Sequence, residues 1–157
     1  MPGSLLELMA RLALAAGLGA ALGIEREYRG KPAGLRTNML IALGSALFTI
    51  VSLGMIGRDG SSDRVAAQIV TGVGFLGGGA ILRDRATVHG LTTAATIWVN
   101  AAIGMAAGLG RFAMAGAATL ITLIVLIVLG PLEGYFERRV GFLRPGGSRP
   151  PSRPDHV

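Results

Sequence analysis

Residues 91–129, LTTAATIWVNAAIGMAAGLGRFAMAGAATLITLIVLIVL, decide the fold of this chain. Arg111 is the one charged residue in this stretch, and Gly110–Arg111 is the break between two apolar runs. A helix that crosses the hydrocarbon core of a bilayer needs about 20 mainly apolar residues. Leu91–Leu109 and Phe112–Leu129 therefore predict two successive membrane-spanning helices that pack as antiparallel neighbours.

Further apolar segments precede this pair, at Leu5–Ile24, Asn38–Ile56 and Val65–Leu82. A membrane helix satisfies its own backbone hydrogen bonds, whereas a β-barrel needs alternating strands of about ten residues, and the sequence shows no such alternation. The predicted fold class is all-α, a polytopic membrane bundle of five transmembrane helices. The first run continues without a clear cleavage site, so we expect a retained span rather than a signal peptide.

The composition agrees with a membrane protein. Hydrophobic residues make up 51% of the 157 residues and charged residues 15%, whereas soluble chains carry about a quarter charged residues. The net charge of +6 comes mostly from residues beside apolar runs, which favours contact with lipid headgroups over nucleic acid. The absence of cysteine excludes disulfides and thiolate metal sites.

The distribution of basic residues predicts the orientation. Under the positive-inside rule, the more basic loops lie in the cytoplasm. One predicted side carries Arg26, Arg29, Lys31, Arg36, Arg83, Arg85, Arg138, Arg139, Arg144, Arg149 and Arg153. The other side carries Arg58, Arg64 and Arg111. We therefore predict an N-terminus outside the cell and a cytoplasmic C-terminus in a multi-pass protein of the bacterial inner membrane.

The chain divides into three predicted parts. Residues 1–130 form the transmembrane domain. Residues 131–143 form an amphipathic juxtamembrane segment whose aromatic residues face lipid. Residues 144–157 are rich in Pro, Gly and Arg, so we expect a disordered tail.

Polar residues inside the spans are the first candidates for function, because they are costly in lipid. Gln68 and Thr71 lie three positions apart in the third predicted span, and Asn100 lies in the fourth, near Thr96. Hydrogen bonds between helices would account for them without a ligand. Glu7 and Arg11 have the spacing and order of an ion pair within one helix.

The densest polar cluster is Glu25–Asn38, EREYRGKPAGLRTN, between the first two predicted spans. Its glycines and proline predict a shaped turn, and Thr37 or Asn38 has the chemistry to cap the second helix. His89–Thr93 predicts a similar cap for the fourth helix. An ordinary positive loop explains the first cluster equally well, and ordinary N-cap hydroxyls would explain the second. The candidate functional polar residues are Glu25, Arg26, Arg36, Asn38, Arg64, Gln68, Thr71, Arg83, Thr92, Thr93 and Asn100.

Glycine spacing predicts helix packing. The sequence from Gly72 to Gly77 fits GxGxxG, but it lies inside an apolar run without the strand-to-helix turn of a dinucleotide site. GxxxG pairs instead allow close approach of helices, within one chain or between the copies of a homo-oligomer. The predicted packing residues are Gly19, Gly23, Gly74, Gly78, Gly104 and Gly108. No hydrolase triad and no metal-ligand cluster is visible, so we expect neither an enzyme nor a cofactor.

Three ordered motifs resemble the MgtC/SapB family of bacterial membrane proteins. They are LGIEREYRGKPAGLRTNMLIALGSALF (22–48), DRVAAQIVTGVGFLGGGAIL (63–82) and VHGLTTAATIWVNAAIGMAAGLGRF (88–112). The resemblance implies a five-span inner-membrane domain linked to growth in low magnesium and to acid tolerance. This chain is similar to a short form without the family's C-terminal soluble domain. Thr92 and Val99 stand where the virulence-associated member has Asn and Cys.

Two functions follow from this resemblance. The first is a regulator of ion or energy balance that binds another membrane protein through small-residue faces. The second is a transporter or channel for Mg²⁺, an ion that prefers oxygen ligands, usually carboxylates. Between Glu7 and Glu25 the sequence has no acidic residue, which favours the regulator.

Overall fold

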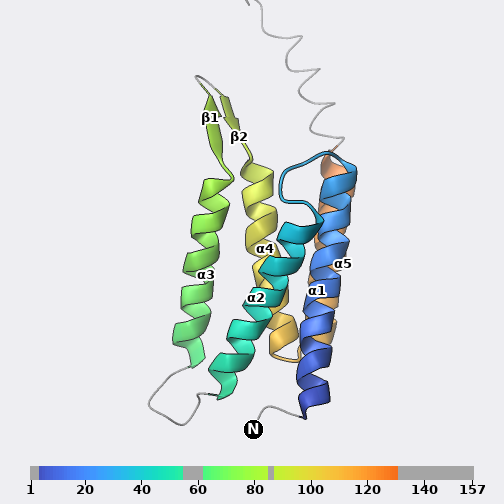
Figure 1. Ribbon diagram of the computed structural model, residues 1–157. Coiled ribbons are helices and arrows are strands. Elements are labelled where there is room, and N and C mark those ends of the chain that lie inside the picture. Colours follow the sequence, from blue (N-terminus) through green and yellow to red (C-terminus); the bar gives the residue numbers. More distant parts are fainter. Residues whose placement is uncertain (1–3, 55–61, 85–86, 131–157) are drawn as a thin grey trace, which may run out of the picture.

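The computed structural model describes residues 4–54, 62–84 and 87–130, which form a helical bundle with one short hairpin (Figure 1). The helices are α1 (Leu5–Tyr28), α2 (Leu35–Gly54), α3 (Ser62–Gly79), α4 (Leu91–Gly108) and α5 (Phe112–Ile124), which continues as the π-helical turn η1 (Val125–Leu129). The strands are β1 (Leu82–Asp84) and β2 (Thr87–His89). The predicted all-helical membrane bundle is confirmed. The predicted segments 131–143 and 144–157 lie outside the described residues.

Four of these elements are long and apolar enough to cross a membrane: α1, α2, α4 and the continuous helix Phe112–Leu129. Helix α3 has the length but is less apolar, because Asp63, Arg64 and Gln68 lie in its first half. Successive helices run in opposite directions (Figure 1), as expected for short connections. The side of the membrane that each end faces stays a prediction.

Helix α1 is longer than predicted. It ends at Tyr28 rather than Ile24, so Glu25 and Arg26 belong to the helix and not to the following loop. The pair formed by Glu25 Oε1 and Arg29 Nε, 2.8 Å apart, has the (i, i+4) spacing that stabilises a helix. The reversal comes later, where Gly30 has a φ of 61° and Ala33 a φ of 58°.

The predicted side-chain caps are wrong. Helix α2 begins at Leu35, which places Asn38 inside its first turns, and the backbone N–H of Asn38 donates to Gly34 O at 3.1 Å. The cap comes from α1 instead, because Glu27 Oε2 accepts the N–H of Leu35 at 2.9 Å. Helix α4 is preceded by Gly90, with φ of 90° and no side-chain cap, so Thr92 and Thr93 do not cap it.

A β-hairpin replaces the loop that was predicted between the third and fourth spans. Leu82 was expected at the end of a span, but it lies in β1 and pairs with His89 of β2. Arg83 pairs with Val88 in the same antiparallel register. The hairpin projects beyond α3 and α4 at the end of the bundle where α1 turns into α2 (Figure 1).

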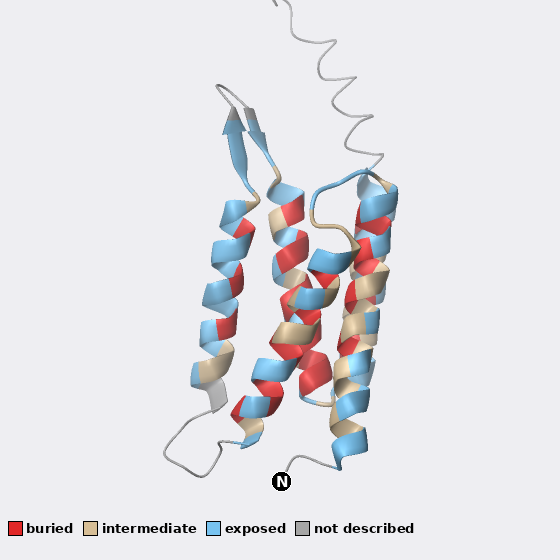
Figure 2. Cartoon of the chain, in the orientation of Figure 1, coloured by how far each residue is buried: buried red, intermediate tan, exposed pale blue. Residues whose placement is uncertain are grey.

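The core is built from small residues at the junction of α1, α2 and α4. Buried positions line the facing sides of these helices (Figure 2). A Cβ added at Gly19 of α1 would lie 2.6 Å from the carbonyl oxygen of Asn38, and one at Gly108 of α4 would lie 2.7 Å from that of Ala46. Helix α2 is therefore packed, backbone against backbone, between α1 and α4.

Candidate functional site

Buried polar side chains gather where α1, α2 and α4 meet, toward the hairpin end of the bundle. Arg26 is 4% exposed, Thr93 is 3% exposed, and Asn38 and Asn100 have no exposed surface. These residues come from different predicted clusters, and the fold brings them to one junction. We call Glu25, Arg26, Asn38, Thr93 and Asn100 the polar junction.

Arg26 connects α1 to the first turn of α4. Its Nη2 donates to Thr93 Oγ1 at 2.8 Å, and the contact is buried. The side chain points into the bundle, whereas a long basic side chain near a membrane interface usually extends toward water. The hydroxyl that sequence reasoning assigned to a cap therefore serves as a partner for a guanidinium.

Asn38 and Asn100 connect α2 to α4. Asn100 Nδ2 donates to the backbone oxygen of Asn38 at 2.7 Å and to Asn38 Oδ1 at 3.1 Å. Asn38 Nδ2 in turn donates to the carbonyl oxygens of Ala33 and Gly34, which end the preceding turn. The pair fixes the start of α2 against the middle of α4. The predicted hydrogen bond between helices is confirmed for Asn100.

Glu25 lies on the side of the junction that faces α5. Its carboxylate pairs with Arg29, whose Nη2 donates to the carbonyl oxygen of Ile127 at 3.1 Å in η1. This contact satisfies a carbonyl of a π-helical turn, where backbone bonding is irregular. Arg29 and Glu27 were missed as site residues, although both lie inside the polar cluster that drew attention to the turn.

Three buried atoms of the polar junction have neither a hydrogen-bond partner nor an ion-pair partner in the described part of the chain. They are Arg26 Nε, Glu25 Oε2 and Asn100 Oδ1. Buried polar atoms are nearly always satisfied, so each of these atoms calls for a water or a ligand. Among the described residues, no group of three or more His, Cys, Asp or Glu side chains could hold a metal ion.

The remaining candidates do not join the junction. Gln68 and Thr71 lie exposed on α3, and the Thr71 hydroxyl donates to the carbonyl of Ala67 in its own helix at 3.0 Å. The Thr96 hydroxyl likewise bonds within α4, to Thr92 O at 2.8 Å. The other exposed candidates are Arg36, Arg64, Arg83 and Thr92.

The three GxxxG pairs are used differently. Gly19 and Gly23 of α1 lie against α2, and Gly104 and Gly108 of α4 lie against α2 from its other side. Gly74 and Gly78 of α3 are exposed and have no atom within 4 Å of the place where a Cβ would stand. The small face of α3 is therefore unfilled by the described part of this chain.

A second charged contact closes the opposite end of the bundle. Arg11 pairs with Glu7 one turn earlier, and its Nη1 donates to the carbonyl oxygen of Gly108 at 2.8 Å. The predicted ion pair within α1 is confirmed. The Arg11 guanidinium thus also satisfies a carbonyl at the C-terminus of α4, where a positive charge is favourable.

Comparison with known proteins assigns the family. Residues 12–135 match the sequence profile of the MgtC family. The chain belongs to the MgtC family. The polar junction and the α1–α2–α4 core both fall within the matched part of this MgtC-family chain, which is a multi-pass bacterial membrane protein. No solved structure matches it.

Several curated relatives are similar along most of the chain. An uncharacterized Synechocystis protein is 47% identical over 133 residues, which is 85% of this chain and 56% of the relative. The putative magnesium transporter YhiD of Escherichia coli strain K12 is 50% identical, over 80% of this chain and 62% of the relative. Protein MgtC of Salmonella typhimurium strain LT2 is 52% identical, over 71% of this chain and 48% of the relative. The chain thus spans about half to three-fifths of the length of these relatives.

Proposed function

We propose that this chain is a non-enzymatic regulator of ion or energy balance under low-magnesium or acid stress. It acts by binding another membrane protein, or a further copy of itself, through the open face of α3. The observation that carries the proposal is the unfilled pair Gly74 and Gly78. The other two GxxxG pairs pack against α2, which supports a packing role for the third pair with a partner outside the described residues.

The geometry of α3 supports a contact surface on its outer side. Its buried positions, Ile69, Val73 and Gly77, follow each other at intervals of four and face the bundle. At 3.6 residues per turn, Gly74 and Gly78 lie about 100° around the helix axis from Val73 and Gly77, on an exposed flank of α3. Phe75, beside them, is 83% exposed. In membranes, small faces of this kind associate because helix backbones approach closely there.

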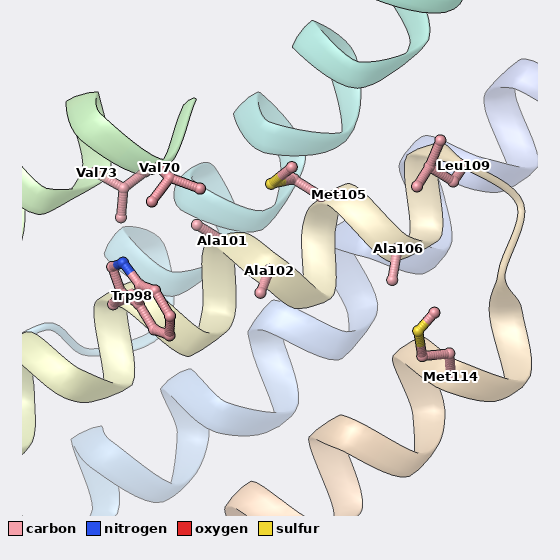
Figure 3. A pocket seen from close by; sticks show the side chains of 9 residues that line it. All are labelled: Val70, Val73, Trp98, Ala101, Ala102, Met105, Ala106, Leu109 and Met114. Atoms are coloured by element: carbon pink, nitrogen blue, oxygen red, sulfur yellow. The ribbon is translucent and has the colours of Figure 1, made fainter. Parts of the chain in front are cut away.

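Apolar pockets flank α3 and add to this surface. One, of about 290 Å³, opens between α3, α4 and α5, with Trp98, Met105 and Met114 among its lining side chains (Figure 3). Another, of about 420 Å³, lies between α2 and α3 and includes Gln68 and Phe48. Methionine adapts its shape to a partner, so the first pocket suits an apolar side chain from a neighbouring helix.

Transport of Mg²⁺ is the second candidate function. It is favoured by the name of the Escherichia coli relative, putative magnesium transporter YhiD. The polar junction would then supply oxygen ligands inside the bundle. Its carboxylate, Glu25, is already paired with Arg29, and amide and hydroxyl oxygens hold a strongly hydrated dication weakly. The regulator therefore fits the arrangement better.

Flux through purified protein separates the two functions. The full chain is reconstituted in liposomes that contain a Mg²⁺-sensitive dye, with empty liposomes as the baseline. For the regulator we expect uptake at the baseline for both the native chain and Asn100→Ala. Strong uptake that Asn100→Ala abolishes would establish transport and overturn the regulatory proposal.

The partner face is tested in cells. A bacterium that lacks its own MgtC-family gene is grown in low magnesium with the native chain, with Gly74→Leu and Gly78→Leu combined, or with Gly17→Leu. Gly17 is a matched control, because it too is exposed on a helix with no atom within 4 Å of a Cβ. We expect the α3 variant, at equal membrane abundance, to lose the rescue of growth that the native chain and the control give. Equal rescue by all three would rule out the α3 face.

A further inference from the structure

Arg26 is a buried cation that makes no contact ion pair with a carboxylate in the described structure. It is 4% exposed, and the one side-chain hydrogen bond of its guanidinium in the described structure is the contact to the neutral hydroxyl of Thr93. Its Nε is buried without any partner. Burial of a charge is costly unless its donors are paired, so the free Nε of this arginine is suited to an additional anionic partner.

The neighbouring acids are engaged elsewhere. Glu25, next in sequence, places Oε1 2.8 Å from Arg29 Nε. Glu27, which is exposed, accepts the N–H of Leu35 at the start of α2. Within the described residues, neither acid lies within ion-pair distance of the Arg26 guanidinium. The Glu25 carboxylate thus lies near two guanidiniums and contacts that of Arg29, so the three groups together carry one excess positive charge.

The guanidinium lies at the amino end of α4, which adds to the positive potential. Thr93 is the third residue of this 18-residue helix, and Gly90 before it provides no side-chain cap. The backbone N–H groups of a first turn have no partners within their helix and carry a partial positive charge. Such a turn is a ready site for an oxyanion, and the planar fork of an arginine matches phosphate oxygens.

We propose that Arg26, the Thr93 hydroxyl and the first turn of α4 bind a phosphate-type oxyanion. Such an oxyanion is carried by the headgroup of an anionic phospholipid and by free inorganic phosphate. Leu91 and Thr92, the two helix residues before Thr93, are exposed. Arg26 lies two residues before the end of α1, about 3 Å along the helix axis. The end of a helix long enough to span the bilayer is expected near the lipid headgroups, which favours the lipid as the source.

The test measures thermal unfolding of the full chain in nanodiscs. One arm compares phosphatidylcholine with a mixture of phosphatidylcholine and phosphatidylglycerol. The other arm adds inorganic phosphate to phosphatidylcholine nanodiscs, against chloride at equal ionic strength. A higher unfolding midpoint in nanodiscs with phosphatidylglycerol would identify the lipid headgroup as the ligand. A higher midpoint with added phosphate would identify free phosphate. A native chain that responds in neither arm would overturn the proposal.

Variants show whether Arg26 carries the response. Arg26→Gln should weaken the apparent affinity about tenfold, since hydrogen bonds to charged groups contribute about 1.5–3 kcal/mol. Arg36→Gln, which removes an exposed charge from the same end of the bundle, should leave the affinity within about twofold. Equal weakening by the two variants would indicate general attraction to the basic surface and refute the site.

A purely structural role for Arg26 gives a different result. Without phosphate or anionic lipid, Arg26→Gln should unfold at or above the native midpoint, because the excess buried charge is gone. A lower midpoint in every lipid would mean that Arg26 serves only to hold Thr93. If Arg26→Gln fails to fold, Thr93→Val is used instead, because it removes one proposed contact to the anion. This variant must reduce the rise of the unfolding midpoint caused by phosphatidylglycerol or phosphate. A rise equal to that of the native chain would exclude Thr93 from the site. The inference stands apart from the proposed function, because these measurements involve neither a partner protein nor Mg²⁺ flux.

Discussion

The Nδ2 of Asn100 donates to the backbone oxygen of Asn38 at 2.7 Å, and this bond joins the middle of α4 to the start of α2. Both side chains lie without exposed surface in the bundle. The position of α2 relative to α4 thus depends on an amide that has its partner in another helix. Asn38 also holds the end of the α1–α2 turn, so one pair of asparagines coordinates three parts of the chain.

Removal of the Asn100 amide should destabilise the bundle. Asn100→Ala loses two hydrogen bonds and leaves Asn38 Oδ1 buried without a donor, so we expect a loss of about 1–2 kcal/mol. Thermal unfolding in detergent measures the change. Thr71→Ala is the control, because that exposed hydroxyl bonds only within its own helix, and it should cost less than about 0.5 kcal/mol. Equal effects of the two variants would contradict the role assigned to Asn100.

A methyl group added at Gly104 should lower the stability of the bundle, whereas one added at Gly116 should raise it. A Cβ at Gly104 would overlap the carbonyl oxygen of Ala42, whereas at Gly116 nothing lies within 4 Å. Gly104→Ala should therefore lower stability by about 1–3 kcal/mol through overpacking. Gly116→Ala should raise it by up to about 1 kcal/mol through helix propensity. Denaturant titration of the two variants tests the sign, and a stabilised Gly104→Ala would argue against the close α2–α4 contact.

Loss of the Glu25–Arg29 pair should loosen the end of α5. The Arg29 guanidinium donates to Ile127 O and is paired at the same time with Glu25 of α1. Glu25→Gln should therefore speed hydrogen exchange in η1 by about tenfold, a change of about 1.4 kcal/mol in local opening. Exchange mass spectrometry of peptides that cover η1 gives the readout, with the Phe112 end of α5 as the internal reference. Unchanged exchange in η1 would show that the pair does not stabilise it.

The predicted orientation is testable because the native chain contains no cysteine. Lys31→Cys and Arg111→Cys place single thiols at exposed positions on opposite ends of the bundle. A membrane-impermeant maleimide applied to intact cells from outside should label Cys at position 111 and not at position 31. Permeabilised cells provide the control that both thiols react. The reverse pattern would invert the assigned topology.

The fold was largely predictable because the decisive signal is local. Apolar runs of spanning length, separated by short polar segments, determine where helices form, and the pair 91–129 needed nothing more. Helix ends were less predictable, because they depend on contacts from elsewhere in the chain. Glu27 caps α2 from α1, and no rule based on adjacent residues anticipates a cap eight positions away. The hairpin was missed for a similar reason, since its strands have only three residues each.

The candidate site was predictable in its ingredients but not in its connections. The sequence pointed to Arg26, Asn38, Thr93 and Asn100 because polar residues near spans are costly. It did not show that Arg26 turns inward to Thr93, or that Gln68 and Thr71 stay outside the core. Those outcomes depend on the rotation of each helix about its axis. For α1 and α4 the close glycine contacts with α2 go with one such rotation, and these contacts become visible only in three dimensions.

The backbone contacts of α2 also determine which glycines of the chain tolerate substitution. Gly19 and Gly104 abut the peptide groups of α2, so even the smallest added side chain there separates two helices. The outer side of α3 meets no such limit, because Gly74 and Gly78 face open space. Descendants of this chain can therefore diversify the surface of α3 while the centre stays fixed. Changes on that surface thus leave the close contacts that hold α1, α2 and α4 together unaltered.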